Sequence, residues 1–581
     1  MRHLLTSAIL IACTLTLPGV DGVSPSDSVA SIKVPSGFSV QLVAAEPVIK
    51  QPVAFTIDDR GRLWVLANVS YPECPGKPEN RIVILEDADG DGTNWKETVF
   101  FDKLNFATGI QVGFGGVYIG APPNLLFFSD KNCDDKPDGE PTVVLDGWGH
   151  QDTHETLNNF TWGPDGWLYG THGVFTHSKV GIPGTPDKDR VKLNAAVWRY
   201  HPVSKKFELH CEGASNQWGI DWNEQGDAFF TACVIPHLYH AIQGARYQRQ
   251  AGQHFNKATF ADIKNITTFR YERAAYCGAT IYLGGLFPAE YRNTLLFNDI
   301  HLSRVRNETL KRNGSGYINE KRPDLAVCSD TWFRTLSLQY GPDGSLFVND
   351  WFDRVHCHQQ RAETDRSNGR IYKIGYEGRK NTVVDLQKLD SAALVQHQLH
   401  ANGRYVRSAR RILQERGSDP AVHAALLNIL KTNTDDTRQL RALWALHATK
   451  GLHEAELQAQ LNNPSEHVRA WAIQLLCEDQ APSAATLAIF EQLAKNESSA
   501  KVRLFLASAL QRMPLAARWP IVTNLAAREE DNTDHNIPLM VWYGIEPAIA
   551  VDRKAALALM RSSKLKTLRE FIPRRLGGGD E

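Results

Sequence analysis

Short apolar segments alternate with turns rich in glycine and aspartate along more than half of the chain. An apolar strand, a Gly/Asp turn and a second apolar strand follow one another in six places, at residues 53–68, 108–122, 159–173, 218–233, 278–301 and 336–351. Aligned on one apolar position each, the copies are 55, 52, 58, 61 and 57 residues apart, the positions being Phe55, Ile110, Trp162, Ile220, Ile281 and Leu338.

A period of this length has room for four short strands and their turns, which is typical of a β-propeller blade. The sequence therefore predicts an all-β six-bladed β-propeller over residues 30–380. Residues 37–47 read as one further strand, which we expect to complete the last blade and close the ring. A β-sandwich is the competing fold, but it does not explain the near-constant spacing.

After about residue 380 the apolar positions change to helical spacing, in segments rich in Ala, Leu and Arg. Arg407, Arg441, Arg469 and Arg503 stand at matching points of these segments, 34, 28 and 34 residues apart. Amphipathic helix pairs repeated at this interval bury their apolar faces against one another. We therefore expect an all-α HEAT-like solenoid over residues 381–575, which serves as a docking module for a partner protein or as a spacer.

Residues 1–22 have the order of a secretory signal peptide, with Arg2, then apolar residues 4–17, then small and turn-forming residues. We expect cleavage near Gly22 and export to the periplasm or cell surface. Alternatively, residues 10–13 resemble a bacterial lipobox, and lipidation of Cys13 would then attach the protein to a membrane. Outside residues 4–17, the sequence contains no run approaching the roughly 20 apolar residues of a membrane span.

The charge composition favours a small neutral ligand. The 64 Lys and Arg residues nearly balance 65 Asp and Glu residues, and the chain has no long basic run. Nothing therefore supports nucleic-acid binding. Eight cysteines follow Cys13, and their wide spacing predicts no particular disulfide. No Cys-x-x-Cys-His motif occurs, so no covalent c-type haem is expected in this chain.

Blade geometry predicts where a binding site would form. The Gly/Asp turn lies at one end of each blade, so residues before the first strand and after the second meet at the other end, the mouth of the ring. The residues at these positions are Asn68, Pro122, His154, Asn158, His172, Asn216, Gln217, His237, His301, Arg334 and Asp350. Most of them are polar or titratable, and they converge from different blades, which predicts a binding site at the mouth.

Two alternatives remain for the histidines of this region. Each one taken singly is also explained as a hydrogen-bonded structural residue. A zinc site at His150 and His154 would need a helix to place both ligands on one face, and Gly147 and Gly149 indicate a loop instead.

Two acidic segments resemble calcium-binding loops. In residues 86–97, Asp87, Asp89 and Asp91 alternate before Gly92, although Thr98 replaces the usual twelfth acidic residue. The second loop offers Asp130, Asn132, Asp134 and Asp138, with Asp135 at the glycine position. For both loops the alternative is a solvated acidic turn.

Five stretches together resemble a known group of proteins: AAEPVIKQPVAFTIDDRGRLWV, ILEDADGDG, DTHETLNNFTWGPDGWLYGTHG, CGATIYLGGLFPAEYRNTLLFNDIH and YVRSARRILQER. The group is the membrane-bound dehydrogenase or haem-binding propeller proteins of planctomycetes and verrucomicrobia. The resemblance covers nearly the whole chain. It implies a propeller related to quinoprotein glucose/sorbosone dehydrogenases, joined to HEAT-like repeats. Many members carry a terminal cytochrome c, which the residues of this chain do not provide.

The resemblance also implies roles for particular residues. In quinoprotein sugar dehydrogenases, pyrroloquinoline quinone (PQQ) lies over the propeller mouth, and a histidine oriented by an acid removes the proton of the substrate hydroxyl. His154, with Asp152 nearby, resembles that base. Arg334 would pair with the cofactor, and Gln217, Asn158 and His172 would position the ligand. Since this chain has no haem motif, either a partner cytochrome would accept the electrons or the chain has lost redox activity altogether.

Three functions stay open from the sequence. The first is a PQQ-dependent dehydrogenase of sugars or other alcohols. The second is a calcium-dependent hydrolase or lactonase, with axial ligands from Asn68, Asn158, Asn216, Asp299 and Asp350. The third is a non-catalytic scaffold that binds carbohydrate or protein, using Trp167, Trp218 and Trp351 as a recognition surface.

Overall fold

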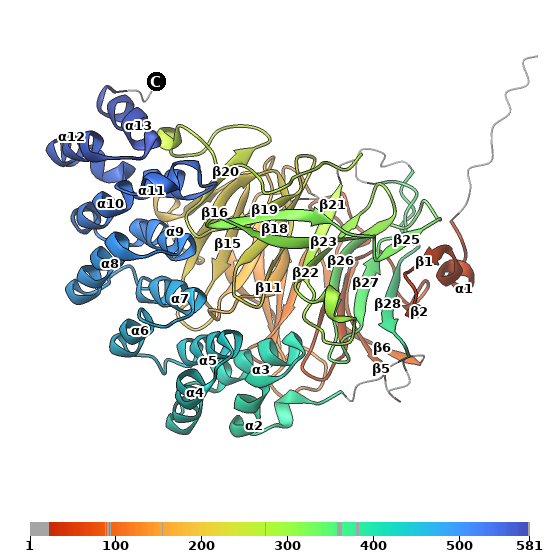
Figure 1. Cartoon of the computed structure of the whole chain (residues 1–581). Helices are drawn as coiled ribbons and strands as arrows, with labels where there is room; N and C mark the ends of the chain where they lie inside the picture. The colour runs from red at the N-terminus through yellow and green to blue at the C-terminus, as the bar shows by residue number, and fades with distance from the viewer. Residues whose placement is uncertain are drawn as a thin grey trace, which may run out of the picture.

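A computed structural model describes residues 22–87, 89, 92, 94–153, 155–272, 275–356, 363–378 and 383–578. Six β-sheets stand around a common axis, and a curved array of helices lies against one side of them (Figure 1). The first two sheets, blades 1 and 2, are four-stranded antiparallel sheets. Blade 1 contains β3 (Pro52–Ile57), β4 (Leu63–Ala67), β5 (Asn80–Asp87) and β6 (Trp95–Leu104), and blade 2 contains β7 (Gly109–Val112), β8 (Gly116–Ala121), β9 (Asn124–Ser129) and β10 (Thr142–Asp146).

Blades 3 and 4 follow in chain order. Blade 3 contains β11 (Asn158–Trp162), β12 (Leu168–His172), β15 (Ala196–Tyr200) and β16 (Phe207–Ala214), with β20 (Arg246–Arg249) paired to its outer edge. A small hairpin of β13 (Ser178–Val180) and β14 (Val191–Leu193) projects from it. Blade 4 contains β17 (Asn216–Trp222), β18 (Ala228–Cys233) and β19 (Leu238–Ala241).

Blades 5 and 6 both take a strand from the N-terminal region. Blade 5 contains β21 (Tyr276–Ile281), β22 (Thr294–Asp299), β23 (Arg304–Asn313), β24 (Gly316–Lys321) and β25 (Ala326–Cys328), and β1 (Ile32–Lys33) pairs with β25; the short helix α1 (Pro25–Ser28) precedes β1. Blade 6 contains β26 (Thr335–Tyr340), β27 (Leu346–Asp350) and β28 (Arg370–Tyr376), and β2 (Phe38–Ala44) lies antiparallel to β28 as its outer strand. The predicted six blades and the closing strand are both confirmed.

Side chains at the blade edges join neighbouring blades through hydrogen bonds. Asn68 Nδ2 donates to the carbonyl of Ala107 at 2.8 Å, joining blade 1 to blade 2. Asn349 Nδ2 donates to the carbonyl of Pro52 at 2.6 Å, joining blade 6 to blade 1. These amides are buried, so each pairs a polar group that would otherwise be costly to bury.

The C-terminal region is helical, as predicted. Its helices are α2 (Ser391–Gln396), α3 (Gly403–Arg416), α4 (Pro420–Thr432), α5 (Asp436–Ala448), α6 (Glu454–Gln460), α7 (Glu466–Leu476), α8 (Ala484–Asn496), α9 (Ala500–Ala509), α10 (Arg518–Ala526), α11 (Ile537–Ile549), α12 (Arg553–Ser562) and α13 (Lys566–Leu576). Among the described residues, no helix is long and apolar enough to cross a membrane.

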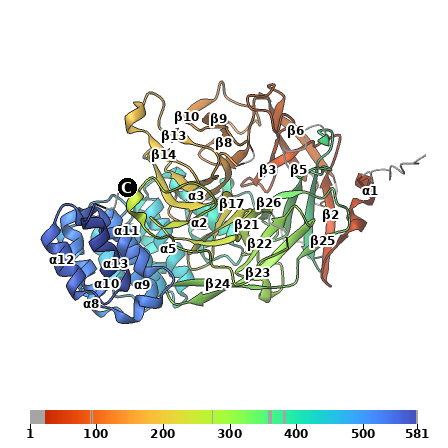
Figure 2. The same cartoon turned by 90° about the horizontal axis from the view of Figure 1, so that it is seen from above.

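Helix starts in this array are set by side-chain caps. Asp435, Ser465 and Ser499 accept hydrogen bonds from backbone N–H groups of the first turns of α5, α7 and α9. Such caps satisfy N–H groups that have no partner within the helix. α3, α5, α7, α9 and α11 contact one another in turn and form the layer nearer the propeller, which Figure 2 shows from above.

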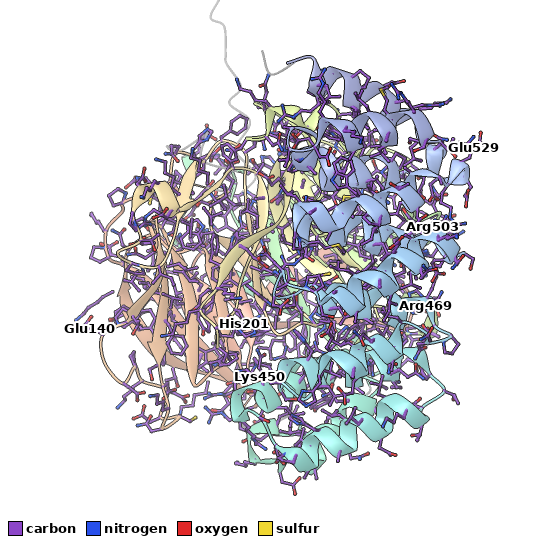
Figure 3. The ribbon with its side chains drawn as sticks, turned by 90° about the vertical axis from the view of Figure 1, so that its left-hand side faces the viewer. Glu140, His201, Lys450, Arg469, Arg503 and Glu529 are labelled. Carbon is purple, nitrogen blue, oxygen red and sulfur yellow. The ribbon has the colours of Figure 1, made fainter. Side chains whose placement is uncertain are left out.

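Two of the regularly spaced arginines hold successive turns of the array together. Arg469 bonds the carbonyls of Asn463 and Pro464 and pairs with Glu497. Arg503 repeats this pattern one level further on, with Asp531 as its acid (Figure 3). Arg407 differs, because its Nη1 bonds Asp221 of the propeller at 2.5 Å. Arg441 also reaches the propeller, where its Nη2 lies 3.1 Å from Glu224 Oε1. The spacing seen in the sequence therefore combines a repeated inter-helix contact at Arg469 and Arg503 with propeller contacts at Arg407 and Arg441.

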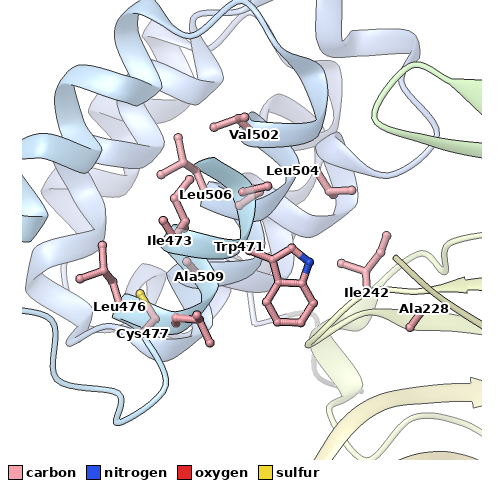
Figure 4. Close-up of a cluster of buried hydrophobic side chains, with 14 of the residues drawn as sticks. Ala228, Ile242, Trp471, Ile473, Leu476, Cys477, Val502, Leu504, Leu506 and Ala509 are labelled. Carbon is pink, nitrogen blue, oxygen red and sulfur yellow. The ribbon is translucent and has the colours of Figure 1, made fainter. Parts of the chain in front are cut away.

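The helical array covers the end of the propeller where the β-turns between first and second strands lie. Trp471 of α7 inserts between the array and blade 4, facing Ile242 and Ala228 (Figure 4). Its Nε1 donates to the carbonyl of Gln225 at 3.3 Å. The adjacent Gly226 has a φ of 77°, and a Cβ there would lie 2.3 Å from Trp471 Nε1. Only glycine fits this close approach without displacing the indole.

Candidate functional site

The end of the propeller opposite the helical array is the predicted mouth, and its loops meet across the ring. Thr153 Oγ1, in the loop before β11, donates to the carbonyl of Pro72, in the loop after β4, at 3.0 Å. Arg366, in the loop after β27, lies 3.3 Å from Glu73 of the same blade 1 loop. Residues from blades 1, 3 and 6 are thereby brought together, as the blade geometry predicts.

Arg334 lies between blades 5 and 6 at this end and is 3% exposed. Its Nη1 donates to the carbonyl of Ile300 at 3.0 Å and to Ser303 Oγ at 3.3 Å. Its Nε is buried and has no hydrogen-bond partner in the described part of the chain. Burial lowers the pKa of Arg334 to about 10, so the guanidinium is charged at neutral pH.

Two carboxyl groups with raised pKa values follow this arginine in blade 6, at the end of β27 and just after it. Asp350 is fully buried, and its Oδ1 accepts the backbone N–H groups of Arg334 at 2.6 Å and Phe352 at 2.9 Å. Burial raises the pKa of Asp350 to about 7 despite these donors. Burial also raises the pKa of Asp353 to about 6. Both groups therefore change protonation near neutral pH, a property common at sites of proton transfer.

Glu155 is a third carboxyl group of this kind, in the blade 3 loop. It is fully buried, and one carboxylate oxygen accepts the backbone N–H of Phe175. The other, Oε2, has no partner among the described residues. Burial and the nearby Asp152 carboxylate raise the pKa of Glu155 to about 8. Its predicted neighbour in function, His154, lies outside the described residues.

The remaining predicted ligand-positioning residues of blade 3 and blade 4 have structural partners. His172 is fully buried, with Nδ1 2.9 Å from the carbonyl of Gly173 and Nε2 2.8 Å from Ser178 Oγ. Burial lowers its pKa to about 4, so it is neutral. Asn158 bonds Thr171, and Gln217 bonds the carbonyl of Gly213. Each amide nevertheless keeps one buried atom without a described partner, Asn158 Nδ2 and Gln217 Oε1.

The other mouth histidines differ in their surroundings. His237 is buried against Glu308, with 2.8 Å between Nε2 and the carboxylate, and its ring stacks on Phe297. His301 lies close to Arg334 in the fold, since Ile300 bonds that arginine, and its ring meets that of His356 edge-on at 4.6 Å. His150 is exposed. The mouth therefore gathers Arg334, Asp350 and His301, whereas His237 belongs to a separate pair.

An aromatic layer underlies this end of the ring. Trp351 and Tyr71 meet edge-on, with ring centroids 5.4 Å apart, and Trp218 packs against the same apolar cluster. Trp351 Nε1 is buried without a described partner. Aromatic rings from blades 1, 4 and 6 therefore pack together at this end of the ring.

No group of three or more His, Cys, Asp or Glu side chains in the described ranges is arranged to hold a metal ion. In the second acidic loop the carboxylates bond their own surroundings: Asp138 accepts from Ser129 Oγ at 2.6 Å, and Asp135 pairs with Arg62 at 2.7 Å. Of the first loop, Asp91 lies outside the described residues, while Asp87 and Asp89 lie within them. The two calcium loops stay predictions.

Sequence reasoning missed Glu155, Asp353 and their titration near neutrality. Glu155 follows His154 directly in DTHETLNN, so a signal was present in the stretch that suggested the histidine. Its burial, however, depends on Gly173, where a Cβ would lie 2.5 Å from Glu155 Cβ. That contact joins positions on either side of the β11–β12 hairpin.

Comparison with solved structures finds propellers of low sequence identity. A putative oxidoreductase (glucose dehydrogenase) from Thermus thermophilus is 15% identical over 58% of this chain and 100% of its own, with a TM-score of 0.42. The PQQ-bound aldose sugar dehydrogenase of Streptomyces coelicolor is 14% identical, covering 59% and 99%, with a TM-score of 0.39. The holo PQQ domain of pyranose dehydrogenase from Coprinopsis cinerea is 13% identical, covering 59% and 97%, at 0.39.

No curated protein matches the chain. One family model does, over residues 24–378, which span the strands of all six blades. The matched segment includes Glu155, Arg334 and Asp350, so the residues gathered at the mouth lie within the family's domain. Because the match covers more than half of the 581 residues, the chain belongs to the family described as Domain of unknown function (DUF7133).

Proposed function

We propose that the protein oxidises a sugar or another alcohol at the propeller mouth, with PQQ as the electron acceptor. The observation that carries the proposal is the set of buried carboxyl groups at this end, whose pKa values of about 8, 7 and 6 lie close to neutrality. A group that accepts and releases a proton near the working pH is suited to general acid–base catalysis. The resemblance seen in the sequence supplies the reaction class.

The chemistry of the mouth residues fits a quinone that carries carboxylates. Arg334 keeps a buried Nε–H without a described partner, and Trp351 keeps an indole N–H in the same state. Both donate hydrogen bonds of the kind that carboxylate and quinone oxygens accept. When bound, PQQ supplies the acceptor for the hydride that leaves the alcohol carbon. Since Arg334 is 3% exposed, reaching it requires side chains above it to move.

Proton removal from the substrate hydroxyl is assigned to residues of the blade 3 loop. The resemblance to quinoprotein dehydrogenases implies His154, oriented by Asp152, as this base. Glu155 is a second candidate for the base, because its Oε2 lacks a partner among the described residues. Asp152 lies close enough to Glu155 to raise its pKa, so the two carboxylates influence each other's protonation. We also propose that the protein is exported through the predicted signal peptide. A partner cytochrome would be the final electron acceptor.

The test reconstitutes the purified full chain with PQQ and calcium. Dye reduction is measured across a panel of aldoses and simple alcohols, and PQQ binding is measured separately by its absorbance and by quenching of tryptophan fluorescence. The proposal expects saturable binding and turnover of at least one substrate. Absence of both would refute it, and binding of a glycan without turnover would instead favour a non-catalytic scaffold.

Three variants assign the roles. Arg334→Gln is expected to weaken PQQ binding by about 10- to 150-fold, because it removes a charge-assisted hydrogen bond worth about 1.5–3 kcal/mol. His154→Ala and Glu155→Gln are expected to lower turnover while PQQ binding persists, and the variant that also removes the acidic limb of the pH profile, where the base becomes protonated, identifies the base. Arg528→Gln, in the helical array, is the matched control and should behave as the unmodified protein.

A further inference from the structure

A cavity of about 590 Å³ lies between blade 3 and the helical array, at the opposite end of the propeller from the mouth. We call it the junction pocket. Its propeller wall is Trp167, His201, Val203, Ser204 and Lys206, and its array wall includes Leu452, Leu457, Leu475 and Leu476. His201 and Lys450, both lining residues, are labelled at this boundary in Figure 3. The volume is in the range of small-molecule sites, roughly 300–1,000 Å³.

The propeller wall presents an indole N–H that lacks a partner. Trp167 is 3% exposed, and its buried Nε1 has no hydrogen-bond acceptor within the described ranges. The ring is held in place by Arg199, whose guanidinium lies 4.1 Å from the ring centroid. Arg199 is fixed in turn by Asp165 at 2.8 Å and by Glu478 at 3.1 Å. This donor belongs to a lining residue, so a ligand oxygen could satisfy it once the side chains that cover it move.

His201 adds a second neutral donor beside Trp167. The two rings meet edge-on, with centroids 5.1 Å apart. Nδ1 of His201 accepts the backbone N–H groups of Val203 at 3.2 Å and Ser204 at 3.1 Å. Burial lowers the pKa of His201 to about 4, so the ring is neutral. A neutral ring that accepts at Nδ1 carries its proton on Nε2 and donates there.

The array wall is apolar and the rim carries balanced charge. Leu475 and Leu476 are 5% and 7% exposed, and Leu452 and Leu457 extend the same surface. On the rim, Lys206 and Lys450 are opposed by Glu454 and Asp479, and Glu478 also lines the pocket. Glu478 is already paired with Arg199. Neither charge sign predominates, so the rim does not select for an ion.

We propose that the junction pocket binds a neutral, largely apolar molecule that carries a carbonyl or hydroxyl oxygen. The oxygen accepts the N–H groups of Trp167 and His201, and the apolar part packs on the leucine wall. A cation would lack an acceptor for its charge beside two donors, and an anion would gain no net attraction from the rim. The site is separate from the proposed dehydrogenase site and does not depend on it.

The test titrates the full chain with 2-decanone by isothermal calorimetry. Decyltrimethylammonium, which has the same chain but a cation in place of the oxygen, and decanoate, which is an anion, are the comparison ligands. The proposal expects 2-decanone to bind at one site per chain and at least tenfold more tightly than either ion. Equal affinity of all three compounds would overturn it, because the site would then select only for apolar chains.

Variants locate the binding. Trp167→Phe keeps the ring and removes the N–H, and it is expected to weaken 2-decanone binding about 2- to 13-fold, the range of one net hydrogen bond. Ala481→Trp, at an exposed position lining the pocket, is expected to block binding without disturbing the core. Ala484→Trp, also exposed but outside the lining, is its matched control. Unchanged affinity in Ala481→Trp would refute the site even if Trp167→Phe fails to fold.

Discussion

Replacing Lys501 by methionine should destabilise the whole protein, because this lysine forms a buried ion pair between the array and the propeller. Lys501 of α9 is fully buried, and its Nζ lies 2.8 Å from each carboxylate oxygen of Asp227, in the turn between β17 and β18. Tyr317 Oη also donates to this carboxylate, and His467 Nδ1 lies 2.8 Å from Nζ. Removing the lysine leaves Asp227 without a buried counter-charge.

Removing one partner of a buried ion pair costs about 3–5 kcal/mol. Asp227 keeps Tyr317 and Asn223 as donors, so we expect the lower end, about 3 kcal/mol. The double variant Asp227→Asn/Lys501→Met leaves no uncompensated charge. It should therefore be less destabilised than the sum of the two single variants, by about 1–3 kcal/mol.

Urea unfolding followed by far-UV circular dichroism and by tryptophan fluorescence measures these free energies. Lys311→Met is the control, since Lys311 and Glu320 form an ion pair at 54% and 47% exposure, for which the expected cost is below about 1 kcal/mol. A loss below about 1 kcal/mol for Lys501→Met, or single-variant effects that add to within about 0.5 kcal/mol, would refute this reasoning.

Three further predictions concern the mouth, the array and the N-terminus. Burial raises the pKa of Glu155 from 4.5 to about 8, so the folded chain binds this proton more tightly than the unfolded chain does. The folded chain therefore loses stability as pH rises from about 4.5 towards 8. Glu155→Gln should flatten that part of the plot of melting temperature against pH, and an unchanged slope would contradict this prediction. Gly226→Ala should cost about 1–3 kcal/mol in urea unfolding, because its positive φ and the Trp471 contact both resist a Cβ, whereas Gly184→Ala, with a similar φ but nothing within 4 Å, should cost less. Cleavage after Gly22 would place the new α-ammonium group of Val23 beside Asp330 Oδ2, which lies 2.9 Å from the Val23 nitrogen. Mass spectrometry of the exported protein should find Val23 as the first residue, and Asp330→Asn should lower the melting temperature. An N-terminus at a lipidated Cys13 would contradict the prediction.

The propeller was predictable because each blade repeats a local pattern. A strand, a turn and a strand leave their period in the sequence whatever lies around them, and the unpaired residues 37–47 indicate the closing strand for the same reason. The seat of the helical array was not predictable. Arg407 and Asp221 are 186 residues apart, and nothing local to α3 distinguishes an arginine that bonds a propeller loop from one that bonds the next helix.

The mouth was predicted in part. Topology alone placed Arg334, Asp350 and His301 at one end, because strand order determines which ends of the strands meet there. Topology does not show which side chains form hydrogen bonds with one another. The sequence prediction therefore grouped His172 and His237 with Arg334, Asp350 and His301. Ser178 and Glu308, which bond these histidines, lie in β13 and β23, whose positions depend on the folded blades. The pKa of Glu155 depends in the same way on burial that only the tertiary structure creates.

The array also confines where chemistry can occur. α3 directs Arg404, Arg407 and Arg411 into the turn end of the propeller channel, where they bond blades 1 and 4. The channel cavity they line has a volume of about 110 Å³, enough for a few water molecules at about 30 Å³ each but not for a sugar. A substrate of the proposed dehydrogenase would therefore have to enter and leave at the mouth.

The contact between the propeller and the helical array makes the two parts one cooperative unit. A single apolar cluster contains Trp167, Trp222 and Phe230 of the propeller together with Trp444 and Trp471 of the array, so neither part can leave the other without exposing it. A ligand in the junction pocket touches both walls of this contact. It should therefore raise the stability of the whole chain by RT ln(1 + [L]/Kd).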